Sequence, residues 1–347
     1  MLKIVYPICC GMDVHKSFVY ACIASTNEQG VTTYKSKRFS TFTKDLRFCA
    51  EWLAENNCKD VCMESTGKYW VPVWNALEDS IHVVIANPKW VSAVKGSKDD
   101  KKDSKWIGDL FRMGLVPSSY IPEKDIRVLR EFTRYRSKLV SMRSGEKCRF
   151  QNAFTVCNLT LDAVVSDMFG KSATDIENYL LESDSVDPNH CVSLLRGSLK
   201  KKSEEIINAV EGFDMTAEQK ERARIIQGHF ADINSRIAQV DEVIGRLVSE
   251  YEGAISLLCT IPGIDRRLAI TIISEIGTDM SQFGSSKRLC NWAGLSPGRN
   301  QSAGKKKSVK ISRAGVYLKP ALVEAAHAAV KATAKNPYFR IKYGRIM

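Results

Sequence analysis

The stretch that decides the fold is IVYPICCGMDVHKSFVYACIASTNEQGVTTYKSKRF, residues 4–39. It contains three runs rich in β-branched and aromatic residues, which end near Asp13, Ser25 and Phe39. Short polar segments separate the runs. Runs of this length joined by tight turns are typical of β-hairpins. The stretch therefore predicts three consecutive strands in an antiparallel meander.

After this meander the pattern alternates between helices and strands. Apolar residues at three- and four-residue spacing predict helices, and short apolar runs predict buried strands. In chain order we expect a helix over 43–56, a strand over 60–64, a helix over 69–77, a strand over 82–88 and helices from about 88 to 115. Three antiparallel strands followed by alternating helices and parallel strands is the order of a ribonuclease-H-like nuclease fold. The fold class expected is α/β with a mixed sheet.

The rest of the chain is expected to be mainly helical. Residues 125–150 predict a basic amphipathic helix. From Ile226 to Tyr251, apolar residues recur at alternating spacings of four and three, which is typical of a coiled-coil seam. That seam packs either against preceding helices of the same chain or against a second copy. The domains expected are 1–157, a helical coiled-coil segment over 158–252, and a mainly helical C-terminal domain over 253–347.

Size and charge narrow the class of partner. The chain has 347 residues, of which 44% are hydrophobic, and a formal net charge of +12. A charge of that size favours phosphate polymers. No apolar run reaches the roughly 18 residues of a spanning helix, and the N-terminus lacks a signal-peptide pattern. We therefore expect a cytoplasmic protein with no membrane partner, whose 11 cysteines are mostly reduced core residues.

Four carboxylates form a candidate metal site. Asp13 and Glu64 end buried strands that are neighbours in the expected sheet, and Asp100 and Asp103 share one helix face. Four acids at one edge repel unless divalent cations lie between them. Hard oxygen ligands suit Mg²⁺, and two such ions roughly 3.5 to 4 Å apart assist phosphoryl transfer. The alternative is that Asp100 and Asp103 belong to a solvated charged face.

Basic side chains form two candidate nucleic-acid surfaces. The first lies on the expected helix over 125–150 and includes Arg127, Arg130, Arg134 and Lys138. The alternative for this helix is a solvated face above a core stripe. The second lies in the C-terminal domain, where residues 299–319 contain seven basic residues and no acid. Its candidates are Arg299, Lys305, Lys306, Lys307, Lys310 and Arg313.

Five motifs in order carry a family resemblance. They are GMDVHK (11–16), MESTGKYW (63–70), NPKWVSAVKGSKDDKKDSKWIGDLF (87–111), IPGIDRRLAITIISEIG (261–277) and NWAGLSPGRNQSAGKKKSVKISRAGVYLK (291–319). Together they resemble the DEDD transposases of the insertion-sequence family numbered one hundred and ten, with the related site-specific DNA invertases. The resemblance implies a RuvC-like domain, a coiled-coil segment and a C-terminal transposase domain.

The resemblance also implies roles for particular residues. The DEDD acids fall on Asp13, Glu64, Asp100 and Asp103, and an essential serine falls on Ser302. Family members usually have Ser-Ser-Gly where this chain has Gln-Ser-Ala, so Ser302 is the only hydroxyl at the motif itself. In such an enzyme the serine attacks a phosphodiester of double-stranded DNA with Mg²⁺ assistance and forms a phosphoserine intermediate.

Further expectations concern partners and surroundings. The resemblance implies that a noncoding bridge RNA supplies sequence specificity for donor and target DNA. It implies a homo-oligomer, either a dimer or a tetramer, in which Ser302 acts in the same chain or in a partner. The location implied is the nucleoid of a bacterium or archaeon.

Two other functions fit the same residues. The first is a RuvC-like endonuclease that hydrolyses junction DNA with metal-activated water, which would leave Ser302 structural. The second is a non-catalytic nucleic-acid-binding protein with a degenerate fold.

Overall fold

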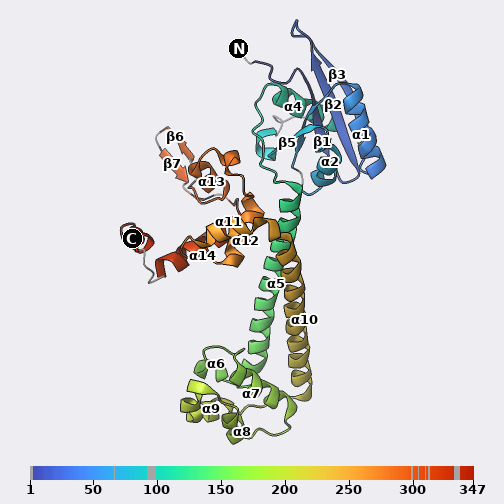
Figure 1. Ribbon diagram of the computed structural model, residues 1–347. Helices are drawn as coiled ribbons and strands as arrows, with labels where there is room; N and C mark the ends of the chain where they lie inside the picture. The colour runs from blue at the N-terminus through green and yellow to red at the C-terminus, as the bar shows by residue number, and fades with distance from the viewer. Residues whose placement is uncertain are drawn as a thin grey trace. The chain divides into compact units, whose positions relative to one another are not determined.

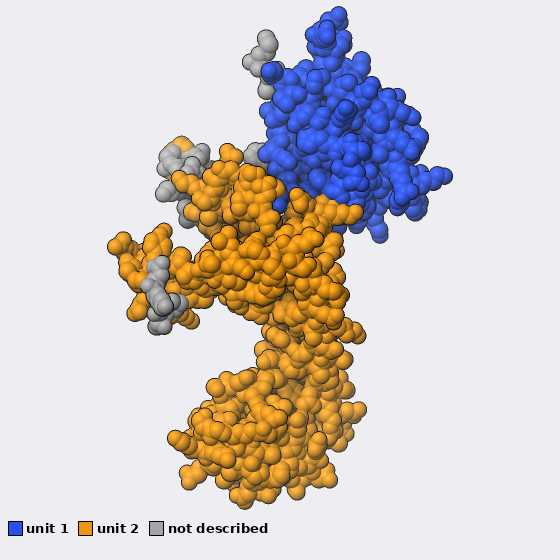
Figure 2. Space-filling view, in the orientation of Figure 1, with its two compact units in different colours: residues 1–121 blue, residues 122–347 orange. Residues whose placement is uncertain are grey.

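The computed structural model describes residues 3–65, 67–91, 99–297, 300–303, 305–308, 310–311, 313–331 and 337–347. The chain divides into two units, residues 1–121 and residues 122–347 (Figure 2). Each unit has buried hydrophobic clusters of its own. The division precedes the basic helix, so the boundary expected after residue 157 lies inside the second unit.

The first unit is built on a five-stranded sheet in the order β3-β2-β1-β4-β5 (Figure 1). Its strands are β1 (Ile8–Val14), β2 (Phe18–Thr26), β3 (Thr32–Ser40), β4 (Asp60–Glu64) and β5 (His82–Ala86). β1, β2 and β3 form the antiparallel meander, whereas β4 pairs in parallel with both β1 and β5. The mixed sheet confirms the predicted α/β class for this part of the chain.

Helices cover both faces of this sheet. They are α1 (Thr43–Glu55), α2 (Trp70–Leu77), α3 (Pro88–Val91) and α4 (Asp100–Arg112). Because side chains alternate along a strand, β1 contributes to two cores. Cys10 and Met12 are buried in the cluster that contains the apolar side chains of α1 and α2. Cys9 is buried on the opposite face with Ile107 and Phe111 of α4.

Two long helices run side by side in the second unit, α5 (Lys124–Thr155) and α10 (Ala217–Leu247) (Figure 1). Heptad positions on α10, including Ile237 and Val240, are buried in one cluster with Leu129 of α5. From the sequence, this apolar stripe could pack against preceding helices of the same chain or against a second copy. In the structure it packs against α5, a preceding helix of the same chain.

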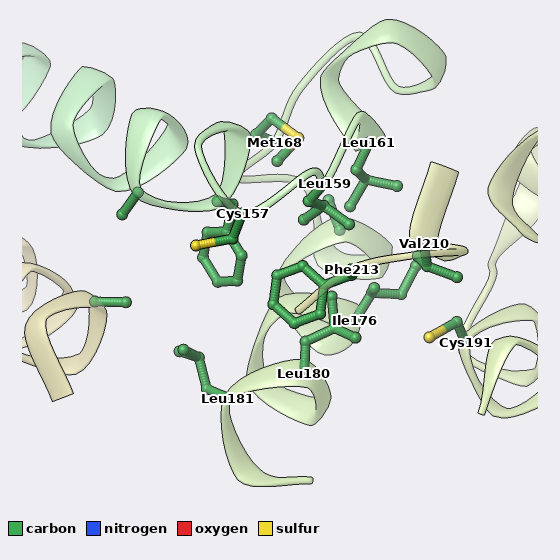
Figure 3. Close-up of a cluster of buried hydrophobic side chains, with 14 of the residues drawn as sticks. Cys157, Leu159, Leu161, Met168, Ile176, Leu180, Leu181, Cys191, Val210 and Phe213 are labelled. Carbon is green, nitrogen blue, oxygen red and sulfur yellow. The ribbon is translucent and has the colours of Figure 1, made fainter. Parts of the chain in front are cut away.

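The segment between α5 and α10 folds into a small helical group. It consists of α6 (Leu161–Val164), α7 (Lys171–Glu182), α8 (Pro188–Ser193), η1 (Gly197–Lys202) and α9 (Ser203–Val210). Its core is drawn in Figure 3, where Leu161, Ile176, Leu180 and Phe213 lie among the clustered side chains. Ile176 and Leu180 come from one face of α7, as four-residue spacing on a helix requires.

The C-terminal part is mainly helical, as predicted. Its elements are η2 (Ser249–Tyr251), α11 (Glu252–Cys259), α12 (Arg266–Ile276), η3 (Met280–Phe283), α13 (Ser286–Trp292), β6 (Asn300–Ser302), β7 (Lys305–Ser308), α14 (Leu318–Lys331) and α15 (Tyr338–Gly344). Before α12 the chain turns at Gly263, where an added Cβ would lie 2.2 Å from the carbonyl oxygen of Ala325. This turn therefore packs backbone to backbone on α14. Within the described residues, no helix combines the length and apolar character needed to cross a membrane.

Candidate active site

Asp13 and Glu64 lie near the ends of two neighbouring parallel strands. β1 and β4 are paired up to the residue immediately before each acid. Because side chains alternate, Asp13 lies on the same face of the sheet as Cys9, and Glu64 lies on the same face as Cys62. Both cysteines belong to the core beneath α4. The strand register therefore brings the two carboxylates to one edge of one face.

The other two predicted acids occupy the first turn of α4, over the same face. Asp100 is the first residue of the helix, and Asp103 follows three residues later in the same turn. Asp99 is the N-cap, and its side chain accepts a 3.1 Å hydrogen bond from the backbone N–H of Lys101. This capping bond gives Asp99 a role distinct from that of Asp100. The positive end of the helix dipole also favours carboxylates in this turn.

Two glycines allow α4 to approach β1. An added Cβ at Gly11 would lie 2.1 Å from the carbonyl oxygen of Ser104 and 2.3 Å from the backbone nitrogen of Gly108. Such distances are far below van der Waals contact, so only glycine fits at Gly11. The close approach places the first turn of α4 beside the end of β1, where Asp13 lies.

His15 lies between two of the acids. Its Nε2 atom is 3.0 Å from Oδ2 of Asp13 and 3.4 Å from Oδ1 of Asp100. Ligand atoms of these three side chains all lie within 4.8 Å of one another. No function is predicted for His15 from the sequence. The available signal was its position two residues after Asp13, in the turn that follows an acid-bearing strand.

The electrostatic environment of Asp13 reflects this crowding. Its pKa is raised, mainly because burial disfavours the charged carboxylate. His15 acts in the opposite direction, whereas the negative charges of Asp100 and Asp103 raise the pKa further. The structure thus places three of the four predicted acids within electrostatic reach of one another.

This arrangement fits a divalent cation. Asp13, His15 and Asp100 offer two carboxylate oxygens and one imidazole nitrogen, and a cation would offset the repulsion that raises the pKa of Asp13. Asp103 and Glu64 lie outside this group of closely spaced ligand atoms. Chemically, the edge can hold a metal ion and, through that ion, a phosphate group.

Two predicted nucleic-acid-binding arginines on α5 instead contact α12. Arg130 donates hydrogen bonds of 2.8 Å to the carbonyl of Ser274 and 2.6 Å to that of Glu275. Arg134 forms a two-pronged ion pair with the Glu275 carboxylate at 2.7 and 2.8 Å. Both guanidinium groups therefore stabilise the packing of α12 on α5.

The other two candidates on α5 differ from this pair. Arg127 donates a 3.0 Å hydrogen bond to the carbonyl of Pro122, two residues before its own helix begins. The Lys138 ammonium lies 5.9 Å from the ring centroid of Tyr317. That distance is near the limit for a cation–π contact, so Lys138 stays available to an anion.

The predicted serine lies in a short hairpin. Ser302 ends β6, and its Cα pairs with that of Lys305 at the start of β7. The backbone of Ser302 is described, but its side chain lies outside what the structure describes, as do those of Lys306 and Lys307.

The remaining C-terminal basic candidates divide into two groups. Lys305, Lys310 and Arg313 are exposed. Arg299 lies outside the described residues.

Two family models match separate parts of the chain. A DEDD model of IS110 described as a transposase matches residues 10–158. A second, described as a transposase of the IS116/IS110/IS902 family, matches residues 255–343. The first match contains all four predicted acids, and the second contains Ser302. The two models belong to the same group of transposases and match in the order that the sequence motifs predict.

One curated relative and two solved structures are also similar. The pilin gene-inverting protein of Moraxella bovis is 39% identical over 77 residues, which cover 21% of this chain and 23% of the relative. The chain thus matches about a quarter of that relative's length. RuvC from Thermus thermophilus has 13% identity and a TM-score of 0.27, over 32% of this chain and 99% of that chain. A Fowlpox virus resolvase in complex with Holliday junction DNA has 18% identity and a TM-score of 0.22, over 30% of this chain and 72% of that chain.

Proposed function

Because this chain belongs to the IS110 family of transposases, we propose that it is a DNA recombinase that cleaves and rejoins double-stranded DNA. The observation that carries the proposal is the group formed by Asp13, His15 and Asp100, whose ligand atoms lie within 4.8 Å of one another. Charged groups packed this closely are typical of sites for metal ions and phosphoryl transfer.

We propose that Asp13, Asp100, Asp103 and Glu64 hold Mg²⁺, as carboxylate oxygens favour that ion. When bound, the ion would stabilise charge on the attacking and leaving oxygens of a phosphodiester. The chain's own contribution is to set the positions of the acids. Strand register places Asp13 and Glu64, while the close approach at Gly11 places α4.

Ser302 is the proposed nucleophile. Its hydroxyl would lose a proton and form an Oγ–P bond, while the P–O bond to the leaving DNA strand breaks and that strand's oxygen takes up a proton. A hydroxyl of the second duplex would then attack the phosphoserine and release Ser302. The exposed Lys305, Lys310 and Arg313, which lie in the hairpin or shortly after it in the chain, support this role because cations of this kind bind phosphates.

The remaining parts of the proposal concern partners. A net charge of +12 supports binding to polyanions, both DNA and a noncoding bridge RNA that would select the sites by base pairing. We propose that Lys138 and the C-terminal lysines contribute to these contacts. The active form would be a dimer or tetramer, in which Ser302 serves the acidic site of its own chain or of a partner.

A denaturing gel tests the reaction directly. The protein is incubated with DNA that spans the boundaries of the element carrying its gene, with the RNA transcribed from the adjacent noncoding region and with Mg²⁺. We expect a protein–DNA adduct that Ser302→Ala, Asp13→Asn and chelation of the metal each abolish. Ser308→Ala, a hydroxyl removed from the same hairpin, is the matched control and should retain the adduct.

Other outcomes identify the alternative functions. Free nicked ends with an active Ser302→Ala variant would point to a RuvC-like endonuclease that uses water. If Asp13→Asn changes no measured property except stability, the protein binds nucleic acid without catalysis. A reaction without the RNA shows whether the RNA guides the enzyme. An RNA-guided enzyme should then form no protein–DNA adduct, whereas an enzyme that needs no RNA should still form it.

A further inference from the structure

A row of side chains crosses the sheet beside the acidic group. The register of the meander pairs Asp13 with Tyr20, and Tyr20 with Arg38. Directly opposed residues in antiparallel strands lie on the same face. Arg38 on β3 therefore lies on the face that carries Asp13, two strand spacings away. At ~4.8 Å for each spacing, the two backbones are about 10 Å apart.

A stack of rings connects Arg38 to the acids. The guanidinium carbon of Arg38 lies 3.9 Å from the ring centroid of Phe18. The same ring stacks on His15, with centroids 4.5 Å apart and an interplanar angle of 28°. His15 in turn contacts Asp13 and Asp100. Phe18 thus lies between a guanidinium group and the imidazole that contacts the candidate metal ligands.

Within the part of the chain that the structure describes, Arg38 forms no ion pair. The side chain is exposed, and among the described residues no carboxylate lies within salt-bridge distance of it. Its packing on Phe18 restricts a side chain that would otherwise be free to move, which lowers the entropic cost of binding an anion. A guanidinium group held in this way suits a phosphate, because its N–H groups match phosphate oxygens.

We propose that Arg38 binds a backbone phosphate of the DNA strand that enters the acidic site, and so sets the position of the cleaved bond. This inference rests on the proposed function. Because one DNA strand rises ~3.4 Å per nucleotide along the helix axis, a separation of about 10 Å keeps this phosphate within a few nucleotides of the cleaved one. Arg38 is a positioning residue, since it binds the strand away from the reacting atoms.

The same strand provides a matched control. Lys35 lies three residues from Arg38 and pairs with Ile23, a residue of the core on the opposite face. Its ammonium donates a 2.9 Å hydrogen bond to Asn56, at the end of α1. Lys35→Gln therefore removes the same charge from β3 as Arg38→Gln does, on the face away from the acids.

Neutral phosphates provide the sharpest test. Single phosphates of the cleaved strand are replaced in turn by methylphosphonate, and cleavage is measured for each substrate. We expect one position near the cleaved bond at which neutralisation slows the wild type about tenfold, the value of one charge-assisted contact. Arg38→Gln should slow cleavage of unmodified DNA about tenfold as well. Neutralising the phosphate at that position should then slow this variant no further. Arg38→Lys keeps a positive charge, so its cleavage should again slow when that phosphate is neutralised.

The same cleavage experiment includes the Lys35→Gln control and can reject the phosphate contact. Lys35→Gln should cleave like the wild type and keep the full methylphosphonate pattern. If Arg38→Gln also keeps that pattern, Arg38 binds no phosphate and the inference is wrong. Thermal unfolding of each variant separates a lost contact from a damaged fold. If Arg38→Gln unfolds, Arg38→Met repeats the test, because it removes the charge and keeps an apolar side chain against Phe18.

A binding measurement keeps this inference separate from the proposed reaction. Asp13→Asn protein is titrated with a fluorescein-labelled mixed-sequence duplex at several salt concentrations. We expect Arg38→Gln to reduce the slope of log affinity against log salt by about one, and Lys35→Gln to leave it unchanged. If the wild type cleaves nothing but this difference appears, the reaction is wrong and the phosphate contact stands. Equal slopes for both variants would reject the contact even in an active enzyme.

Discussion

A methyl group at Gly11 would occupy space that the backbone of α4 already fills, 2.1 Å from the carbonyl oxygen of Ser104. We predict that Gly11→Ala destabilises the protein by about 1–3 kcal/mol, the usual cost of overpacking. It should also slow DNA cleavage by about a hundredfold, because α4 carries Asp100 and Asp103 and a shift of ~1 Å misplaces them. Urea denaturation and the cleavage assay measure the two effects.

The control for this prediction is a glycine with open surroundings. Gly228 lies inside α10, and nothing lies within 4 Å of an added Cβ there. Gly228→Ala should therefore stabilise the protein by about 0.5–1 kcal/mol through helix propensity and leave cleavage unchanged. A Gly11→Ala variant as stable and active as the wild type would show that α4 does not depend on this close approach.

The buried carboxyl group of Glu177 should make the free energy of unfolding depend on pH. Glu177 is 1% exposed in α7, and its Oε1 atom has no hydrogen-bond partner among the described residues. Burial, and then the negative charge of Asp167, raise its pKa from 4.5 to about 8. Between those values the unfolded chain has released this proton while the folded chain keeps it. The free energy of unfolding therefore falls as pH rises through this window, by up to ~1.4 kcal/mol per unit.

Replacement of this carboxyl group should remove the effect. Glu177→Gln stays neutral, so its stability relative to the wild type should increase from pH 5 to pH 7.5 in urea denaturation. Glu205→Gln, on a side chain that is 58% exposed in α9, is the control and should show no such trend. Parallel pH profiles for Glu177→Gln and the wild type would mean that Glu177 ionises normally in the folded protein.

At the scale of elements, one buried ion pair contributes to the contact between α5 and α12. The Glu275 side chain is 4% exposed, and Arg134 contacts both of its carboxylate oxygens. Arg134→Ala leaves a buried carboxylate without its partner. Because Arg134 itself is 41% exposed, we discount the full cost of a broken buried pair and predict a loss of about 2–3 kcal/mol. Urea denaturation gives this value.

Two further variants show whether burial is the cause. Glu275→Gln combined with Arg134→Ala removes the unpaired charge and should recover part of the loss. Arg246→Ala breaks the exposed pair with Glu242 on α10, where the side chains are 64% and 73% exposed, and should cost no more than about 0.5 kcal/mol. Equal effects of Arg134→Ala and Arg246→Ala would contradict a buried role for Glu275.

At the scale of the whole molecule, the two units have separate cores. The cluster between the sheet and α1 and α2, like that beneath α4, lies entirely within residues 1–121. A domain of this size with its own core can fold alone. We therefore predict that a fragment of residues 1–121 unfolds cooperatively on heating, as followed by circular dichroism. A gradual, non-cooperative signal would show that this sheet needs the second unit.

Much of the fold could be predicted because its signals are local. Alternation along β1 depends on residues two positions apart, and the apolar stripe of α10 on residues three and four apart. Both are therefore visible in the sequence. The stripe could not identify its partner, because α5 is as compatible with it as a second copy would be. That choice depends on the path of residues 156–216, which no local pattern specifies.

The candidate site shows the same division between local and distant information. Sequence alone determined the element order, the positive charge, the motifs of the family and the acids at strand and helix ends, all of which depend on residue type and spacing. Only the tertiary structure placed His15 against Asp100, 85 positions away, and directed Arg130 and Arg134 to α12. Such contacts join segments that are distant in the sequence, so no local pattern of residue types and spacings specifies them.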